Sequence, residues 1–214
     1  KGTSGLVKKR NMENKLFDFL ETYMPLEEEE KAAITELALF RNYKKGAVLL
    51  REGQMVLEGF FVISGCVRRY YIIDGEEKTT AFFTEFESVT ATPTIESEPA
   101  EYYLACVEDS LLIVSNPSLE KIIFEKFPRF EKLCRILSEK LLAENQASFD
   151  TFRTSSPEQR YLELLENRPD LVQRVPQYQL ASYLGMKPES LSRIRKRLLS
   201  QAKQHHSYAL SVKN

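Results

Sequence analysis

The chain has 214 residues and a formal net charge of −1, with 43% hydrophobic and 29% charged residues. This composition is that of an ordinary folded protein and excludes a chain that is disordered throughout. No apolar run reaches the roughly 18 residues of a membrane-spanning helix, and the amino end lacks the apolar core of a secretion signal. We therefore expect a cytoplasmic protein with no membrane partner.

The charges are distributed unevenly along the chain. Residues 12–154 hold 16 Lys and Arg against 26 Asp and Glu, whereas residues 155–214 hold 10 against 5. This pattern predicts two domains, an acidic body and a basic carboxyl-terminal domain that faces a polyanion. The three cysteines, Cys66, Cys106 and Cys134, are far apart, which argues against a disulfide framework or a CxxC metal site.

The amino-terminal third predicts helices followed by strands. Residues 1–11 show no periodic pattern, so we interpret them as a tag remnant or a disordered leader. Two short helices follow, separated by a break near Pro25. The glutamates at positions 27–30 begin the second helix, and we expect them to form a solvated first turn. From residue 41 to about 115, short β-prone runs separated by glycines predict six to eight strands, with a hairpin turn at Asp74-Gly75. Strands at this spacing form a sandwich or a jelly-roll barrel.

Helices return after Asn116-Pro117. A short one ends before Pro128, and a longer one extends to about residue 154. Its apolar stripe of Phe130, Leu133, Leu137 and Leu141 either packs on its own barrel or pairs with a second copy. The expected regions are thus a barrel with flanking helices over 12–117, a long-helix region over 118–154 and a basic helical domain over 155–214.

The segment Gln177–Leu199 fits two helices joined by a tight turn. Leu180 and Leu184 supply the core of the first helix, Gly185 permits the turn, and Pro188 opens the second helix. The exposed face of the second helix carries cations for phosphates and guanine, and one carboxylate that can accept from cytosine. The candidate DNA contacts are Gln177, Lys187, Glu189, Ser190, Ser192, Arg193, Lys196 and Arg197.

A simpler interpretation of this helix needs no DNA. Glu189 and Arg193 are four residues apart, so they could pair on a solvated surface for a few tenths of a kcal/mol. A protein-interaction module that has lost DNA binding is a related alternative. The density of basic residues argues against both alternatives, because a surface that binds only protein does not require it. Five basic residues occur within eleven positions: Lys187, Arg193, Arg195, Lys196 and Arg197.

Three segments resemble the Crp/Fnr family of bacterial transcription regulators: KKGAVLLREGQ, FFVISGCVRRYYIIDGEEK and ASYLGMKPESLSRIRKRL. The resemblance implies an α+β chain with an N-terminal double-stranded β-helix (jelly-roll) sensor barrel, a long dimerisation helix and a C-terminal winged helix-turn-helix-like domain. It implies a non-enzymatic homodimer that binds double-stranded DNA, with RNA polymerase as a further partner. The sensor barrel would then span residues 12–117 and the DNA-binding domain residues 155–214. The dimerisation helix region would span residues 118–154, with Phe130, Leu133, Leu137 and Leu141 as the dimer interface. Glu189 and Arg193 match family positions that contact base edges. The tail SQAKQHHSYALSVKN lacks the glycine hairpin of a regular wing, and we take His205 and His206 as surface residues.

The resemblance also locates a phosphate-binding cassette that this chain lacks. Cyclic-nucleotide-binding members hold the phosphate with an arginine and backbone amides, in a segment that maps to residues 86–105. No glycine or arginine occurs there, and residues 79–120 hold no Lys or Arg against eight Asp and Glu. Because a buried phosphate would be repelled by Glu96, Glu98 or Glu101, we expect a barrel that does not use cyclic AMP in the usual way. A cyclic AMP-responsive regulator with a divergent cassette is the alternative.

The sequence does not identify the effector. A neutral polar pocket could be formed by Thr90, Thr92, Tyr102, Tyr103, Asn145 and Gln146; the alternative is a pocket filled by side chains that responds to nothing. We expect no cofactor, because the chain lacks the amino-terminal cysteine cluster of an iron–sulfur regulator, and both histidines lie at the far carboxyl end. A cupin-like metalloenzyme would need histidines on the barrel strands, and that region has none.

Overall fold

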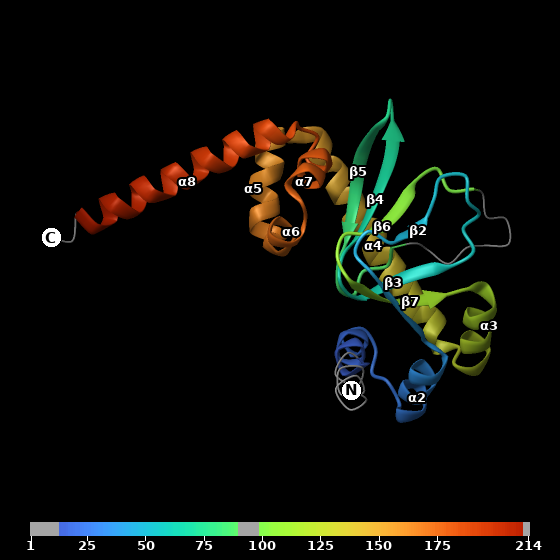
Figure 1. Ribbon diagram of the computed structural model, residues 1–214. Coiled ribbons are helices and arrows are strands. Elements are labelled where there is room, and N and C mark those ends of the chain that lie inside the picture. Colours follow the sequence, from blue (N-terminus) through green and yellow to red (C-terminus); the bar gives the residue numbers. More distant parts are fainter. Residues whose placement is uncertain (1–12, 90–98, 212–214) are drawn as a thin grey trace, which may run out of the picture. The chain divides into compact units, whose positions relative to one another are not determined.

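The structure is a computed structural model that describes residues 13–89 and 99–211, with side chains as far as residue 201. Its chain divides into two compact units (Figure 1). The first unit combines the residues up to 72 with residues 80–147. The second combines the hairpin residues 73–79 with the chain from residue 148 onward.

The strands form two sheets. One has the order β1-β7-β3 and the other the order β2-β6-β4-β5. Their bounds are β1 Leu39–Tyr43, β2 Val48–Leu50, β3 Gly59–Ser64, β4 Val67–Ile73, β5 Glu76–Phe83, β6 Tyr103–Cys106 and β7 Ser110–Ser115. The pairs β1–β7, β3–β7, β2–β6 and β4–β6 are antiparallel. This arrangement confirms the predicted two-layered barrel.

The predicted hairpin between β4 and β5 is also confirmed. Asp74 and Gly75 have φ values of 53° and 78°. Two consecutive residues in the left-handed region are what a two-residue hairpin turn of matching twist requires. Asp and Gly are among the residues that adopt this conformation at the lowest cost.

Strand β3 is buried on both faces. Phe60 and Val62 belong to the cluster that fills the barrel, whereas Phe61 and Ile63 belong to a second cluster outside it. Successive side chains of a strand point to opposite faces, so the run FFVI must supply two cores at once. The barrel interior is completed by apolar residues from the other strands, among them Leu50, Val67, Phe83, Leu104, Leu112 and Val114.

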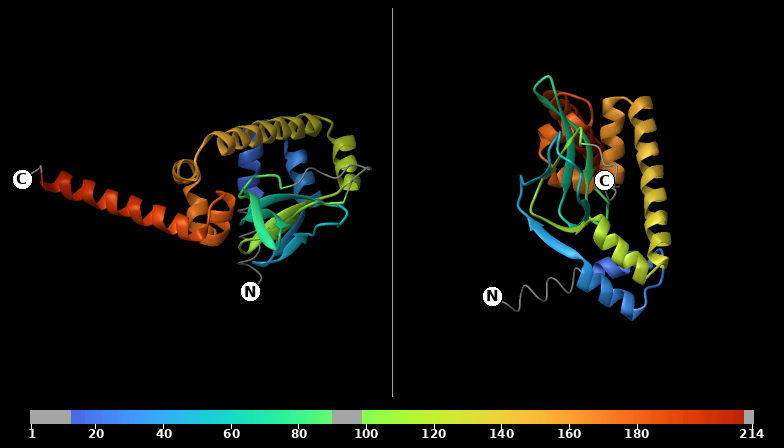
Figure 2. Two further views of the ribbon diagram at one scale, coloured as in Figure 1. Left: turned by 90° about the horizontal axis from the view of Figure 1, so that it is seen from above. Right: turned by 90° about the vertical axis from the view of Figure 1, so that its right-hand side faces the viewer.

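The second cluster is covered by helices. Residues 13–21 are helical, and α2 (Glu28–Leu37), α3 (Pro117–Lys126) and α4 (Arg129–Thr154) follow. The helix break predicted near Pro25 and the end of α3 before Pro128 are both confirmed. Figure 2 shows α4 as one long helix.

The start of α2 differs from the expected solvated turn. Glu30 is only 3% exposed, and its carboxylate accepts from the Glu27 amide at 2.8 Å. The same carboxylate pairs with Arg129 Nε at 3.3 Å. Glu27 and Glu30 form a capping box, which satisfies amides that an isolated helix end leaves without partners. Glu30, one of the four glutamates at positions 27–30, is thus buried and links α2 to the start of α4.

The apolar stripe of α4 packs on its own chain at its amino-terminal end. Phe130 and Leu133 are each 5% exposed, and both belong to the outer cluster of the first unit. Leu137 packs against the same cluster, and Leu141 is half-buried. Phe130 and Leu133 therefore face this chain's own core, where they help to cover the outer face of β3.

The second unit is helical apart from the hairpin residues. Its helices are α5 (Pro157–Asn167), α6 (Pro169–Arg174), α7 (Gln177–Tyr183) and α8 (Pro188–Ser211). The predicted pair of helices around Gly185 is confirmed as α7 and α8, whereas the short α6 was not predicted. The first turns of α8 adjoin α5 and α7, and the rest of α8 extends away from them (Figure 1).

The carboxyl-terminal segment differs from a regular wing. In the part of the chain that the structure describes, no strand follows α8, which continues as a helix to Ser211. The sequence after residue 199 has no glycine or proline until its end, so nothing interrupts the helix. His205 and His206 lie in this helix, beyond the residues whose side chains are described.

We predict that Gly65→Ala destabilises the first unit by about 3 kcal/mol or more, because the substitution adds a clash to backbone strain. Gly65 has a φ of +105°, and a Cβ atom there would lie 2.7 Å from the Ser110 Cα atom. Gly46, with a φ of +81° and no atom within 4 Å, is the matched control, for which Gly46→Ala should cost about 1 kcal/mol. Urea denaturation followed by circular dichroism measures both; equal costs would contradict the clash.

Candidate functional site

The core of the helix-turn-helix is closely packed. Leu180, Ala181 and Leu191 are fully buried, and Leu184 is 2% exposed. Gly185 adopts a φ of +69°, as the turn requires. These contacts fix the angle between α7 and α8, and with it the direction in which α8 presents its exposed face.

Arg160 on α5 ties this turn to the end of α4. Its Nε and Nη2 atoms donate to the Leu184 carbonyl at 3.1 and 2.9 Å. Its Nη1 atom donates to the carbonyls of Phe152 and Ser155 at 2.8 and 2.6 Å. The guanidinium also lies 4.2 Å from the centre of the Phe152 ring, and a Cβ atom on Gly185 would come within 3.3 Å of it. Arg160 thus satisfies carbonyls at two helix ends that have no partner within their own helices.

The predicted DNA contacts lie at the start of α8 and beside it. Glu189, Arg193 and Lys196 are exposed, and Ser190 and Ser192 are half-buried. Among the residues with described side chains, Arg193 donates to Ser190 Oγ at 3.2 Å and makes no ion pair with Glu189. The guanidinium and the carboxylate are therefore both open to a ligand, rather than paired as the simpler interpretation requires.

The remaining predicted contacts lie around this face. Lys187 is exposed in the turn, and Gln177 Nε2 donates to the Pro188 carbonyl at 3.3 Å. Arg197 differs, because its guanidinium pairs with the Glu158 carboxylate on α5. Arg197 is thus directed toward the neighbouring helix, while Arg193 and Lys196 provide the free cations of this face.

The described part of the expected cassette is backbone-paired. Ala100, which the family resemblance places near the expected arginine and serine, is 5% exposed and packs in the barrel cluster. Its carbonyl accepts from the Gly53 amide at 2.7 Å, and its amide donates to the Gln54 carbonyl at 2.9 Å. Both polar groups of its backbone are therefore occupied. Thr90, Thr92, Glu96 and Glu98 lie outside the described residues.

The other residues of the predicted polar pocket are spread over two elements. Tyr102 and Tyr103 are adjacent at β6, so they point to opposite faces of the sheet. Tyr103 stacks on Tyr70 with ring centres 5.1 Å apart, and Tyr102 packs against the barrel cluster. Burial raises the pKa of Tyr102, and the Arg69 charge partly opposes this increase. Asn145 and Gln146 are exposed on α4.

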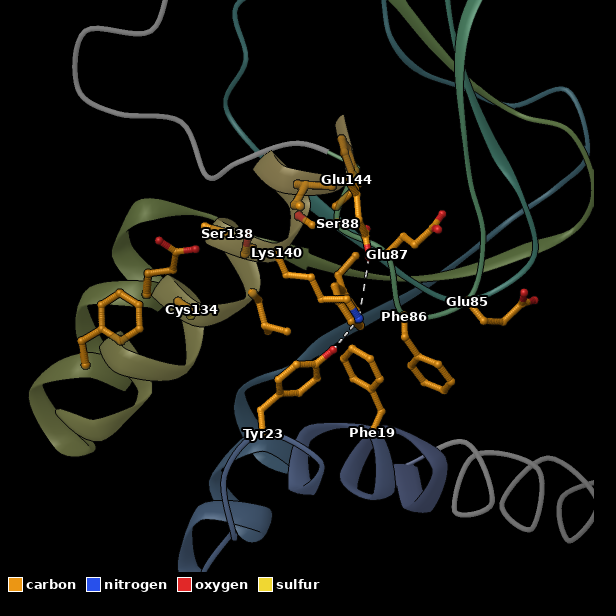
Figure 3. A pocket seen from close by; sticks show the side chains of 17 residues that line it. Phe19, Tyr23, Glu85, Phe86, Glu87, Ser88, Cys134, Ser138, Lys140 and Glu144 are labelled. Carbon is orange, nitrogen blue, oxygen red and sulfur yellow. Dashed lines mark hydrogen bonds and ion pairs between the residues drawn. The ribbon is translucent and has the colours of Figure 1, made fainter. Parts of the chain in front are cut away.

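A cavity of about 650 Å³ lies in the first unit, outside the barrel (Figure 3). Of the predicted polar pocket, the four residues that the structure describes, Tyr102, Tyr103, Asn145 and Gln146, do not line it. Its walls come from the helix of residues 13–21 and the turn after it, β3, residues 85–88, the end of β7, α3 and α4. They comprise Phe19, Tyr23, Phe60, Phe61, Glu85, Phe86, Glu87, Ser88, Ser115, Glu120, Phe124, Cys134, Leu137, Ser138, Lys140, Leu141 and Glu144.

Two ionisable groups on the α4 wall of the cavity have raised pKa values. The pKa of the Cys134 thiol is raised to about 11, first by desolvation and then by the charge of Glu120. The pKa of Lys140 is raised mainly by its hydrogen bond with Tyr23, and further by the charges of Glu144 and Glu87. Cys134, although its side chain is exposed, is therefore protonated at neutral pH, and Lys140 is a cation.

Two further properties bear on function. In the described residues, no group of three or more His, Cys, Asp or Glu is arranged to hold a metal ion. None of the helices described here combines the length and the apolar composition that crossing a membrane requires.

The chain was compared with known proteins. Residues 40–125 match the cyclic nucleotide-binding domain family. A search of curated protein sequences found no match. Among solved structures, CLP of Xanthomonas campestris, a c-di-GMP-responsive global regulator, superposes with a TM-score of 0.64 at 20% identity, covering 82% of this chain and 93% of CLP.

Two further structures extend the similarity. FixK2 of Bradyrhizobium japonicum has a TM-score of 0.62 at 20% identity and covers 77% of this chain and 86% of its own. The catabolite activator protein of Thermus thermophilus has a TM-score of 0.51 at 19% identity, with 84% and 87% covered. This chain has the Crp/Fnr fold. Each similarity includes both the barrel and the helical region, so the expected fold class is confirmed.

Within this Crp/Fnr fold, the structure reveals an arginine near the barrel interior that the sequence analysis missed. The Arg69 guanidinium on β4 lies 5.9 Å from the ring centre of Phe83, a residue of the barrel cluster, and 5.7 Å from that of Tyr102. Arg69 Nε donates to Thr80 Oγ1 at 3.2 Å. Strand alternation in VRRYYII predicts that Arg68 and Arg69 face opposite sides of the sheet. This alternation could have identified one of the two arginines as facing the barrel interior.

Proposed function

We propose that this chain is a cytoplasmic transcription regulator that binds double-stranded DNA sequence-specifically as a homodimer. The observation that carries the proposal is the exposed face at the start of α8, where Arg193 and Glu189 are not paired with each other. An arginine can bond to the O6 and N7 atoms of guanine, and a carboxylate can accept from cytosine N4. Lys187 and Lys196 flank these groups and suit phosphate contacts.

The charge distribution supports a nucleic-acid partner. Residues 155–214 carry a balance of 10 Lys and Arg against 5 Asp and Glu, although the whole chain is nearly neutral. Phosphate contacts by such a domain release counterions, so its binding should weaken as salt increases. RNA polymerase is the further partner that a regulator of this type would contact on DNA.

A second copy would pair along the exposed part of α4. Leu142 is 68% exposed and Phe149 is 58% exposed, and the two are seven residues apart on one helix. Apolar residues at this spacing form the seam of a coiled coil. Asn145 lies between them on the same face, a kind of polar position that specifies register in such seams. We therefore propose Leu142 and Phe149 as interface residues, in place of the buried Phe130 and Leu133.

The sensor barrel, in this proposal, does not bind a cyclic phosphate in the way of cyclic-nucleotide-binding members. Ala100 and Glu101 fall near the position of the cassette arginine, and Ala100 is a buried residue with both backbone groups paired. A buried phosphate needs a cation that compensates for its lost hydration. No Lys or Arg occurs between residues 79 and 120 to provide one.

Arg69 favours the alternative of a cyclic AMP-responsive regulator with a divergent cassette. Its guanidinium is on β4, outside the cassette, yet it approaches Phe83 and Tyr102 on the interior side of the sheet. In the described part of the chain, its one hydrogen bond is that of Nε to Thr80, which leaves other N–H groups for an anion. This arginine could replace the missing one.

We predict that Arg193→Ala weakens specific DNA binding by about 1–3 kcal/mol and relaxes specificity at one base pair. A preferred duplex is first selected from a random library with the full chain, and affinity is then measured by mobility shift at several salt concentrations. Arg51→Ala, at an exposed barrel arginine, is the control and should change neither quantity. If no duplex shows salt-sensitive binding, the protein-interaction module is the better interpretation.

We predict that Leu142→Glu shifts the dimer toward monomer, with a dissociation constant raised about a hundredfold, because the substitution buries a charge in an apolar seam. Sedimentation velocity over a concentration series measures the change. Leu57 has the same 68% exposure but lies in a loop of the barrel, so Leu57→Glu is the matched control. Equal effects of the two substitutions would exclude α4 as the interface.

We predict no micromolar binding of cyclic AMP in a calorimetric titration of the full chain. Micromolar binding would overturn this part of the proposal. In that case, Arg69→Met would test the alternative, since it keeps much of the side-chain volume and removes the charge. A loss of at least about tenfold in cyclic AMP affinity would identify Arg69 as the replacement cation.

A further inference from the structure

The aromatic cavity of the first unit is separate from the barrel interior. The barrel is filled by the cluster that includes Val62, Leu104 and Leu112, whereas the cavity is closed by α3, α4 and the helix of residues 13–21. Its volume of about 650 Å³ is within the range of small-molecule sites, roughly 300–1,000 Å³. Of the segment that maps to the cassette, only residues 86–88 are among the described residues that line it, and none of its lining residues belongs to the helix-turn-helix.

Aromatic rings form one wall of the cavity. Phe19 and Phe86 stack with ring centres 4.9 Å apart, and Phe61 and Tyr23 lie 6.2 and 5.3 Å from Phe19. Figure 3 shows the Tyr23 hydroxyl pointing at the tip of the Lys140 side chain, with Phe19 beside Tyr23. Such rings bury apolar area and attract cations through their faces.

The charges around the cavity are predominantly negative. Four glutamates, Glu85, Glu87, Glu120 and Glu144, line it against a single basic residue, Lys140. Glu87 Oε2 accepts from the Thr84 amide at 2.6 Å, and Glu85 Oε1 accepts from the Gly65 amide at 2.9 Å, which fixes both carboxylates in place. An anionic ligand would be repelled by this lining, whereas a cation would be attracted.

The Lys140 ammonium already occupies a cation position. Its Nζ atom donates to the Tyr23 hydroxyl at 2.7 Å and lies 5.4 Å from the centre of the Tyr23 ring. Glu144 is 3.8 Å from the same nitrogen, and the charge of Glu87 also acts on it. The Lys140 side chain is 52% exposed, so its flexible stem can move the ammonium out to water without opening the core.

We propose that the aromatic cavity binds a small aromatic primary amine in its protonated form, whose ammonium replaces that of Lys140. The aromatic body of the ligand would pack on Phe19 and Phe86. Its ammonium would meet the Tyr23 ring and the Glu144 carboxylate, which lies 3.8 Å from Lys140 Nζ, and the charge of Glu87 would act on it as it acts on Lys140. This site lies wholly within the first unit and does not rest on the proposed DNA binding.

Three compounds of one skeleton test the charge requirement in calorimetric titrations of the full chain at neutral pH. They are naphthylmethylamine, a cation; naphthylmethanol, which is neutral; and naphthoate, an anion. We expect the amine to bind at least about tenfold more tightly than the alcohol, and the carboxylate not to bind measurably. Absence of amine binding at millimolar concentration, or tighter binding of naphthoate, would overturn the proposal.

Two substitutions test the position of the ammonium. Lys140→Met removes the competing cation and should raise amine affinity about tenfold, with the alcohol unchanged within about twofold. Glu87→Gln keeps an oxygen for the Thr84 amide but removes the charge, and should lower amine affinity about tenfold. Lys132→Met is the control for the first, since Lys132 is exposed on the same helix but does not line the cavity.

Other results of these variants would contradict the assignment. Weaker amine binding in Lys140→Met would show that Lys140 itself holds the ligand. If Lys132→Met changed amine affinity as much as Lys140→Met, the effect would not come from the cavity. Circular dichroism confirms that each variant is folded. Arg193→Ala should bind the amine as the parent chain does, so a failure of DNA binding and a failure of this site are distinguishable.

Discussion

The burial of β3 on both faces is the constraint on which the first unit depends. Phe60 and Val62 fill the barrel, so Phe61 and Ile63 must be covered from outside. Exposing these side chains would cost on the order of 1.5–3 kcal/mol each, and only helices supply a cover of the necessary area. The positions of α4 and of the helix of residues 13–21 follow from this requirement. The aromatic cavity lies where the helical cover leaves space over the strand.

In the second unit, the corresponding constraint is the turn at Gly185. The turn ends α7 with carbonyls that α7 cannot satisfy, and Arg160 bonds to the one at Leu184 while also holding the end of α4. The exposed face of α8 is therefore placed by an arginine that contacts no ligand. The positive charge of the domain has two uses, since Arg160 and Arg197 bind within the protein, whereas Arg193 and Lys196 face outward.

The lack of basic residues in the expected cassette and the acidic lining of the cavity have the same origin in the sequence. The stretch of residues 79–120 contributes only acids, and three of them, Glu85, Glu87 and Glu120, line the cavity. The same composition that makes a buried phosphate unfavourable makes a buried ammonium favourable. In these two proposals, the acidic first unit suits a cationic ligand, and the basic second unit suits a nucleic acid.

The sequence by itself determined the order of elements, the Asp74-Gly75 hairpin and the helix-turn-helix, because each depends on local periodicity and on residues with special backbone preferences. It did not determine which apolar residues of α4 are buried, since Phe130, Leu133, Leu142 and Phe149 are equally apolar in a sequence pattern. The tertiary structure decided this by packing the first two in the outer cluster of β3 and leaving the other two exposed. The burial of Glu30, the approach of Arg69 to Tyr102 and the position of Lys140 beside Tyr23 were likewise decided by residues distant in sequence. Local patterns contain no information about such pairings, because they form only when separate segments pack together.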